Sequence, residues 1–178
     1  KQKTEFMHRT ESGSYRKDDG YTAAPRSLNY GRMVFVLPDE GVTPESLLQR
    51  QGFLAELTGD YNAAELVWSV PKFDVKSSTE LNGVLQALGV TDAFDMAEAD
   101  FTPLTDNGAF LSSAMQAARV KIDEEGVEAA AYTEIVCADS AMMEVPPTVE
   151  MDLDRPFLFV IFDNSNVPLF VGTVNTMA

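Results

Sequence analysis

The sequence is poor in the residues that carry most covalent catalysis. Among 178 residues there is one cysteine, Cys137, and one histidine, His8. A nucleophile needs a base beside it, and these two residues lie far apart along the chain with no third group indicated. There is no glycine-rich phosphate loop either. We therefore expect that the protein is not an enzyme. His8 is interpreted as a structural or surface residue, and Cys137 excludes an intrachain disulfide without deciding the redox compartment.

Positive charge is also scarce. Thirteen Lys and Arg residues face 28 Asp and Glu residues, which leaves a formal net charge of −15. Because a surface that binds phosphate groups needs clustered Lys and Arg, we expect neither nucleic acid nor a membrane as a partner. Five carboxylates fall between Asp92 and Asp106, but their spacing is not that of an EF-hand. We interpret this stretch as a surface loop and expect no metal and no cofactor.

Long apolar runs are missing as well. The sequence contains no stretch of about 18 apolar residues, the length that a membrane-spanning helix needs. Hydrophobic residues nevertheless make up 45% of the chain, and eleven of them are Phe. A chain of this length and composition is sufficient for one globular domain with a hydrophobic core.

Helix starts are indicated by two capping residues. Thr43, followed by Pro44, predicts the first turn of a helix. Ser78 predicts the cap of another helix, whose apolar residues recur at i, i+3, i+4 and i+7 and which ends at Gly89. A further short helix is expected over Phe53–Leu57.

Strands are expected where Val, Phe, Leu and Ile are dense or alternate with polar residues, at Tyr21–Leu28, Arg32–Pro38, Ala64–Val75, Phe110–Ile122, Thr148–Leu153, Phe157–Phe162 and Val167–Val174. The polar stretch Lys1–Tyr21 is interpreted as strands joined by Ser-Gly and Asp-Asp-Gly turns. Pro25 predicts an edge or bulged strand. The last two strands predict a buried C-terminal β-hairpin. The fold class is therefore α+β, mostly β, with a few short helices.

The stretch Lys121–Pro147, reading KIDEEGVEAAAYTEIVCADSAMMEVPP, fits two conformations. Its Glu-Ala-Ala-Ala run favours a helix, and an acidic, alanine-rich run is commonly a solvated helix or linker. Read at a period of two, however, one face collects only small or apolar residues, namely Val127, Ala129, Ala131, Thr133 and Ile135. No proline interrupts the run from Lys121 to Met143, so every amide there could join a β-ladder. This stretch could therefore be an exposed loop that becomes a strand, with Gly126 as its hinge.

The run EEGVEAAAYT, from Glu124 to Thr133, closely resembles the proximal hinge of the serpins, a family of serine protease inhibitors. The resemblance continues upstream through FVLPDEG, VPKF and LQALGVTDAFD, and downstream through PPTVEMDLDRPFLFVIFDNSNVPLFVGTV. These blocks occur in the family's order and spacing and cover nearly the whole chain. The resemblance implies a serpin-like fold with mixed sheets, in which residues 1–178 form the C-terminal half of a single domain.

The resemblance also implies a function. Residues 124–147, approximately, would form a reactive-centre loop, and the protein would be a serine-type endopeptidase inhibitor that acts once, as a suicide substrate. A protease would cut the loop, and the hinge would then insert into the central sheet as an added strand. The implied hinge residues are Glu124, Glu125, Gly126, Val127, Glu128, Ala129, Ala130, Ala131, Tyr132 and Thr133. Val127 replaces the usual Thr or Ser but is small enough for insertion, and Tyr132 falls on the outward face.

Two further residues take their roles from the resemblance. Lys72 in VPKF and Glu124 match a pair that forms a salt bridge at the top of the central sheet, although two unrelated surface charges would give the same sequence. Gln116 stands where serpins often carry a histidine in the sheet-opening region. It can form hydrogen bonds there but does not titrate.

The position of the reactive bond is left open, because two ways of counting residues along the loop give different bonds. Counting from Gly126 by the usual spacing places it at Ser140–Ala141, and counting back from the Pro-Pro pair places it at Met143–Glu144. We prefer the first, because the length of the inserted strand determines it. Ser140 implies a protease with a small pocket, of elastase or subtilisin type, whereas Met142 or Met143 implies a chymotrypsin- or elastase-like pocket. No Arg or Lys lies nearby, so a trypsin- or thrombin-like target is not expected.

The expected partner is thus a serine protease with a small or medium apolar specificity pocket. The family resemblance implies a secreted protein that acts outside the cell or at its surface, as a monomer when complete. The alternative is a serpin-fold protein that does not inhibit and serves for binding or storage. The small, uncharged inward face of the hinge favours the inhibitor.

Overall fold

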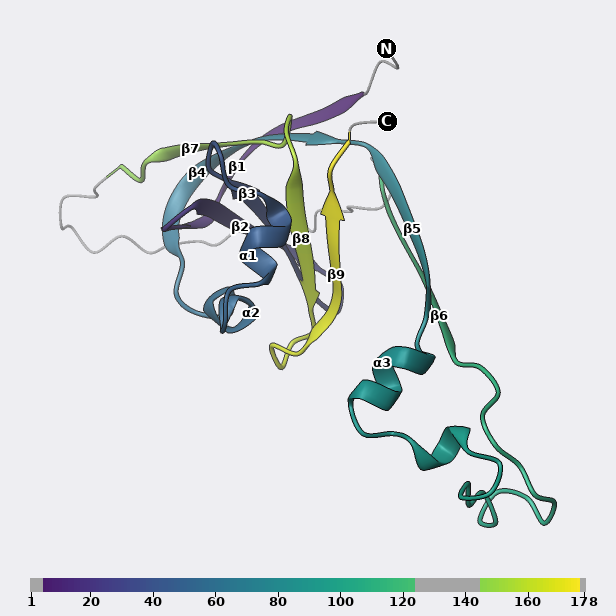
Figure 1. The fold of residues 1–178 in the computed structure, drawn as a ribbon. Helices are drawn as coiled ribbons and strands as arrows, with labels where there is room; N and C mark the ends of the chain where they lie inside the picture. The colour runs from purple at the N-terminus through teal and green to yellow at the C-terminus, as the bar shows by residue number, and fades with distance from the viewer. Residues whose placement is uncertain (1–4, 124–144, 177–178) are drawn as a thin grey trace. The chain divides into compact units, whose positions relative to one another are not determined.

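The computed structural model describes residues 5–123 and 145–176 and divides into two compact units (Figure 1). The first unit combines Lys1–Phe73 with Lys121–Ala178, and the second unit is Asp74–Val120. Strands outnumber the short helices, which confirms the expected α+β, mostly β class. No helix in the described parts of the chain is long and apolar enough to cross a membrane.

The first unit is built on a seven-stranded sheet with the order β7-β4-β1-β2-β3-β8-β9. Its strands are β1 (Phe6–Asp18), β2 (Tyr21–Leu28), β3 (Gly31–Pro38), β4 (Asn62–Pro71), β7 (Thr148–Asp152), β8 (Phe157–Phe162) and β9 (Pro168–Val174). Neighbouring strands run antiparallel, except that β7 is parallel to β4. The sheet is therefore mixed, as the fold class predicted.

Strand β1 takes part in two pairings. Phe6–Tyr15 pair with β4, and Arg16–Asp18 pair with β2. The predicted Ser-Gly turn inside this stretch was wrong, because β4 supplies backbone partners along the whole of Phe6–Tyr15. The predicted Asp-Asp-Gly turn is confirmed, and Gly20 adopts the φ of 86° that it requires.

Pro25 lies in an interior strand of the sheet rather than at an edge. The register between β2 and β3 is continuous, with Pro25 opposite Val34, so there is no bulge. The last β2 residue that pairs with β1 is Ala23. One side of β2 therefore has no ladder partner at Pro25 in the described pairing, and the missing N–H is tolerated there.

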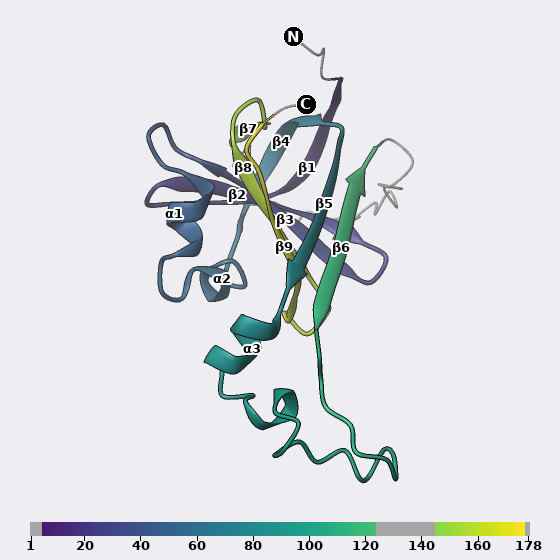
Figure 2. The same ribbon diagram turned by 45° about the vertical axis from the view of Figure 1, so that its right-hand side comes forward.

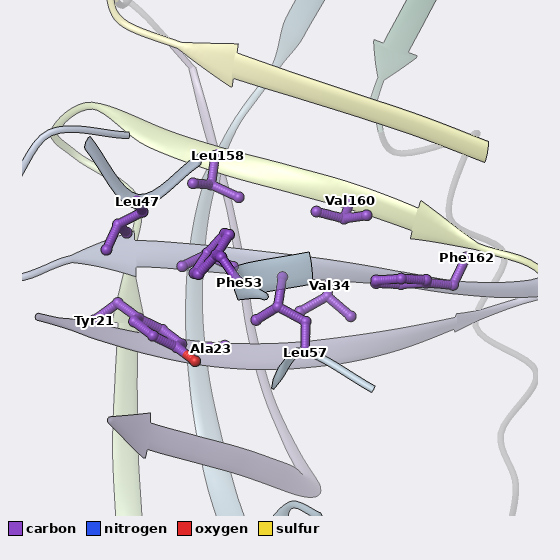
Figure 3. Close-up of a cluster of buried hydrophobic side chains, with 10 residues drawn as sticks. Tyr21, Ala23, Val34, Leu47, Phe53, Leu57, Leu158, Val160 and Phe162 are labelled. Carbon is purple, nitrogen blue, oxygen red and sulfur yellow. The ribbon is translucent and has the colours of Figure 1, made fainter. Parts of the chain in front are cut away.

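One hydrophobic cluster covers a face of β2, β3 and β8 (Figure 3). Its ten buried residues are Tyr21, Ala23, Val34, Val36, Leu47, Phe53, Leu57, Leu158, Val160 and Phe162. Two short helices, α1 (Pro44–Leu48) and α2 (Phe53–Glu56), contribute side chains to it. Tyr21 and Phe53 meet edge to face with their ring centroids 5.4 Å apart. This is the core that fixes the helices to the sheet.

The start of α1 follows the local sequence. The Ser46 amide donates to Thr43 Oγ1 and the Thr43 amide donates to Ser46 Oγ, both at 3.2 Å, which makes a capping box. Pro44 occupies the first turn, where it needs no hydrogen-bond acceptor. The predicted cap is confirmed, and it turns Leu47 into the hydrophobic cluster.

The opposite face of the sheet buries a second set of aromatic rings. Trp68 of β4 meets Phe35 of β3 edge to face at 5.5 Å, and Phe35 lies 6.3 Å from Phe157 of β8. The predicted alternation of β4 is confirmed, since Leu66, Trp68 and Val70 are all buried. Strand β4 is therefore fixed by its inward side chains and presents the alternate ones outward.

Strands β8 and β9 form the predicted C-terminal hairpin. Strand β8 is buried, as expected, but β9 is buried only at Val174. Leu169, Phe170 and Val171 are between 42% and 53% exposed. The prediction that the whole hairpin is buried was therefore wrong for β9. That strand ends the sheet, and the described residues leave the side chains of its first four positions uncovered.

The second unit holds most of β5 (Phe73–Glu80) and β6 (Met115–Ile122), together with α3 (Asn82–Ala87) and the 3₁₀ helix η1 (Asp92–Phe94). Strands β5 and β6 form a two-stranded sheet and run in opposite directions (Figure 2). The acidic stretch between Asp92 and Asp106 is largely exposed, which agrees with a surface loop.

Two boundaries in this unit differ from the sequence-based prediction. Ser78 lies inside β5 and does not cap α3, and Phe110–Ala114 precede β6 rather than forming part of it. Asn82 supplies the physical reason. Its Oδ1 accepts from the Ala114 amide at 2.7 Å, and its Nδ2 donates to the Ser112 carbonyl at 3.3 Å. These contacts fix the helix start against the segment before β6.

Candidate reactive-loop site

Strand β6 leads into the predicted hinge. Along it the even-numbered side chains become more buried toward the loop, from exposed Gln116 through half-buried Val120 to Ile122, which is 7% exposed. Arg119 and Lys121 point outward and are exposed. The predicted inward face of this strand is confirmed at the end nearest the loop, whereas Gln116 is exposed.

One edge of β6 is open in the described part of the chain. The small sheet contains only β5 and β6, so the backbone groups of β6 that face away from β5 have no strand partner among residues 5–123 and 145–176. An open strand edge is able to accept another strand through backbone hydrogen bonds.

An ion pair connects β5 to β6 below the hinge. Arg119 donates from Nε to Asp74 Oδ1 and from its terminal nitrogen to Asp74 Oδ2, both at 2.7 Å. Lys76 Nζ lies 3.6 Å from the same carboxylate. These hydrogen bonds, chiefly those from Arg119, lower the pKa of Asp74 to about 2. The two-pronged geometry fixes the register of the strands.

Lys72, directly after β4, is held beside Glu5, directly before β1. Its amide donates to the Glu5 carbonyl at 2.9 Å, and its Nζ lies 2.6 Å from the Glu5 carboxylate. The partner that the resemblance implies, Glu124, lies outside the described residues. The salt bridge between Lys72 and Glu124 therefore stays a prediction.

Strand β7 fixes the other end of the loop. It pairs in parallel with β4 from Thr148 opposite Glu65 to Asp152 opposite Ser69, and the Glu65 amide donates to the Pro147 carbonyl at 3.0 Å. Met151, in the middle of this strand, is fully buried. The chain that follows the loop thus joins the seven-stranded sheet at Thr148.

Most of the predicted site residues lie outside the described residues. They are the hinge residues Glu124, Glu125, Gly126, Val127, Glu128, Ala129, Ala130, Ala131, Tyr132 and Thr133, the two candidate bonds with Ser140, Ala141, Met142, Met143 and Glu144, and Cys137. Their roles remain predictions. The structure places the strand on each side of them.

The Asp74–Arg119 pair was not found by the analysis of the sequence. Alternation places Arg119 on the outward face of β6, but its partner on β5 is 45 residues away along the chain. Only the pairing of β5 with β6 brings the two side chains together. A search for opposite charges at the outward positions of both strands would have been the available signal.

Comparison with known proteins decides the family. The family model described as "Serpin (serine protease inhibitor)" matches residues 1–177. The chain belongs to the serpin family. It is 34% identical over 154 residues to Serpin B11 of Mus musculus, covering 83% of this chain and 39% of that protein. It is 31% identical over 176 residues to Alpha-1-antiproteinase 2 of Equus caballus, covering 95% of this chain and 40% of that protein.

Solved serpin structures share the fold. The thermophilic serpin Tengpin in its native state matches with a TM-score of 0.72 and 31% identity, over 98% of this chain and 46% of that chain. The complex of thyroxine-binding globulin with thyroxine matches with a TM-score of 0.74 and 28% identity, over 97% of this chain and 46% of that chain. This serpin chain spans about two fifths of the length of the curated relatives named above.

Proposed function

We propose that this serpin inhibits serine proteases by offering the chain between β6 and β7 as a suicide substrate. The observation that carries the proposal is the hinge itself. It is a proline-free run whose inward positions, read at a period of two, hold only small or apolar residues. The anchored strand β7 beyond it supports the same function.

The first step is attack by the protease's serine on the carbonyl carbon of Ser140. The bond to the Ala141 nitrogen breaks, that nitrogen takes a proton and becomes a free amine, and Ser140 stays esterified to the protease. The hinge is then held to the inhibitor only through β6. An inserted strand of about twelve residues at ~3.3 Å each would extend roughly 40 Å and would carry the acylated protease with it.

Strand β7 keeps the second product in place. Thr148–Asp152 pair with β4, and neither Met151 nor Leu153 is exposed to solvent. None of these contacts depends on an intact loop, so the new amine at Ala141 stays near β7 when the hinge moves. Re-formation of the peptide bond then loses its nucleophile, because the two reacting groups are no longer held together.

The driving force comes from strand addition. At ~1 kcal/mol net for each new backbone hydrogen bond, with the burial of the inward face added, the release is of the order of 10 kcal/mol. That amount is enough to distort a protease that is joined to the moving end. The target has a small pocket if Ser140 precedes the cut and a medium apolar pocket if Met142 or Met143 does. We place this action outside the cell or at its surface, with the complete protein a monomer.

The test uses the full-length protein mixed with elastase-, subtilisin- and chymotrypsin-type proteases. A covalent complex that survives a denaturing gel is expected, with a fragment whose mass places the cut after Ser140. Clean cleavage of the loop that leaves the protease fully active would overturn the inhibitor. That result would favour the non-inhibitory alternative, a protein used for binding or storage. The likeness to thyroxine-binding globulin in complex with thyroxine supports this alternative.

A further inference from the structure

The outward side chains of β1, β4 and β7 form a regular grid, which we call the β7 face. Partners across the strands point to the same side of a sheet. The register gives three rows, His8–Ser69–Asp152, Thr10–Val67–Glu150 and Ser12–Glu65–Thr148. The Thr148 hydroxyl lies 3.3 Å from the Glu65 carboxylate, as the shared side requires. The alternate residues of the same strands, Leu66, Trp68 and Met151, are buried beneath.

The β7 face is hollowed over two of its rows. A groove of about 410 Å³ is lined by residues of all three strands, among them His8, Thr10, Glu150 and Asp152. Each of these four side chains is exposed. The groove gives another molecule a recess bordered by two carboxylates from β7.

The charge of the β7 face has one sign. Its nine positions include Glu65, Glu150 and Asp152 but neither Lys nor Arg. Arg9 borders the groove, yet it sits at the alternate position of β1 and its guanidinium pairs with Glu11 at 2.8 Å. A partner that docks on this face therefore meets negative charge, and complementarity calls for Lys and Arg on the partner.

The reactive bond lies close to this face along the chain. At no more than ~3.5 Å per residue, a cut at Ser140–Ala141 is within about 25 Å of Thr148, and a cut at Met143–Glu144 is within about 14 Å. A domain of about 200 residues has a radius of gyration of about 16 Å. A protease that holds either bond is therefore wide enough to cover the start of β7.

We infer that the β7 face is a second contact for the protease that takes the loop, and that it favours proteases with Lys and Arg beside their active-site cleft. The inference rests on the proposed function and names the partner's surface chemistry. The β7 face acts before the loop is cut. Its three carboxylates raise the rate of encounter with the protease by electrostatic attraction, and the loop sequence determines which bond is cut.

The test compares two triple variants of the full-length protein that change the net charge equally. One neutralises the face with Glu65→Gln, Glu150→Gln and Asp152→Asn. The matched control neutralises the exposed acidic stretch with Asp92→Asn, Glu98→Gln and Asp106→Asn. The measured quantity is the second-order rate constant for loop capture by an elastase- or subtilisin-type protease with a basic surface. It is measured at about 0.01 M and about 0.15 M ionic strength, where the Debye lengths are about 30 Å and about 8 Å.

The face variant is expected to be about tenfold slower at the lower ionic strength and to lose most of that difference at the higher one, while the control stays within about twofold of the wild type. The inference would be overturned if the rate constant fell equally in both variants, or if it fell in neither. Thermal unfolding establishes that each variant folds, and Glu150→Gln alone replaces the triple if it does not.

Failure of the proposed function gives a different result. If proteases cut the loop but form no stable complex, inhibition fails, yet kcat/KM for loop cleavage takes the place of the inhibition rate and the same two variants decide the inference. If no protease of the series cuts the loop, both proposals are overturned.

Discussion

Phe53 lies inside the hydrophobic cluster with 1% of its surface exposed, and its ring meets Tyr21. It belongs to a helix of four residues, which is held by packing because so short a helix is unstable alone. Phe53→Ala in the full-length protein should lower the free energy of unfolding by about 3–5 kcal/mol. Denaturant unfolding measures this. Tyr30→Ala, at a residue 86% exposed, is the control and should stay within about 0.5 kcal/mol. A loss below about 1 kcal/mol for Phe53→Ala would contradict the core described above.

Tyr61 packs against the same cluster, and its hydroxyl donates to the Leu57 carbonyl at 3.0 Å. Burial raises the pKa of Tyr61 to about 12, above its ordinary value of 10.0. The folded protein therefore favours the neutral phenol. Its contribution to stability is complete below pH 10 and is lost as the pH rises from about 10 toward about 12.

A rapid pH jump followed by phenolate absorbance tests this pKa. Tyr61 should ionise only in a late step at high pH, and Tyr61→Phe should reduce the amplitude of that step. The late step does not vanish in this variant, because burial also raises the pKa of Tyr21. If Tyr61→Phe lowered the phenolate absorbance only in an earlier step and left the late step unchanged, the pKa of Tyr61 would not be raised.

The two predicted helix caps, Thr43 and Ser78, show when a single residue predicts local structure correctly and when it does not. Thr43 was identified correctly because its partner, Ser46, is three residues away and the capping bonds are local. Ser78 has a similar local setting, yet it belongs to β5, whose partner β6 begins at Met115. Strand pairing over that separation overrides a cap preference of about 1 kcal/mol, and nothing near Ser78 in the sequence records it.

At the scale of elements, the Asp74–Arg119 pair links β5 to β6 and depends on pH. The pKa of Asp74 is lowered from 3.8 to about 2, so the link is complete above about pH 4 and is lost as the pH falls toward about 2. A titration of the carboxyl carbon by NMR should give a midpoint near 2 in the wild type. Arg119→Gln should return the midpoint toward 3.8, because the largest cause of the shift is removed. An unchanged midpoint in this variant would mean that Arg119 does not hold Asp74.

Elements were predicted best where their pattern is local. The buried strand β3 and the alternation of β4 agree with the structure because side-chain type alone encodes them. The partners of these strands were not predictable in the same way. Strand β1 reads as two strands with a Ser-Gly turn, and only its pairing with β4 keeps it extended. The β7 face likewise needs the register of three distant strands.

At the scale of the whole molecule, the prediction is that hinge insertion depends on which face carries a charge. Read at a period of two, the sequence predicts Ala131 on the inward face of the hinge and Ala130 on the outward face. Ala131→Arg would bury a guanidinium without a partner, so it should abolish insertion and convert the inhibitor into a substrate. Ala130→Arg is the matched control and should keep the covalent complex.

The measurement is the ratio of covalent complex to cleaved protein on a denaturing gel, with the full-length protein in excess over protease. The Ala131 variant should give only cleaved protein, while the Ala130 variant should resemble the wild type. If the two variants form equal amounts of complex, the assignment of the inward face by a period of two is wrong.

The membership of the family was recognisable from the sequence, and the described strands confirm the fold that it implies. Among the described residues, the blocks that carried the recognition lie in β3, where β4 meets β5, in α3 and η1, and in β7 and the C-terminal hairpin. The exposure of β9 was not predictable, because burial of Leu169 and Phe170 depends on what packs over them and not on their own hydrophobicity. The roles within residues 124–144 rest on resemblance and on the experiments above.

During synthesis of this protein, β3 is made long before its partner β8. Arg32 and its partner Phe162 are 130 residues apart. A ribosome that adds about 5–20 residues per second therefore leaves β3 without β8 for roughly 6–26 s. During that interval a strand with six buried side chains in the finished sheet keeps one edge unpaired. The yield of native protein is then decided by competition between completion of the chain and aggregation through that edge, so slower translation of the stretch between β3 and β8 lowers it.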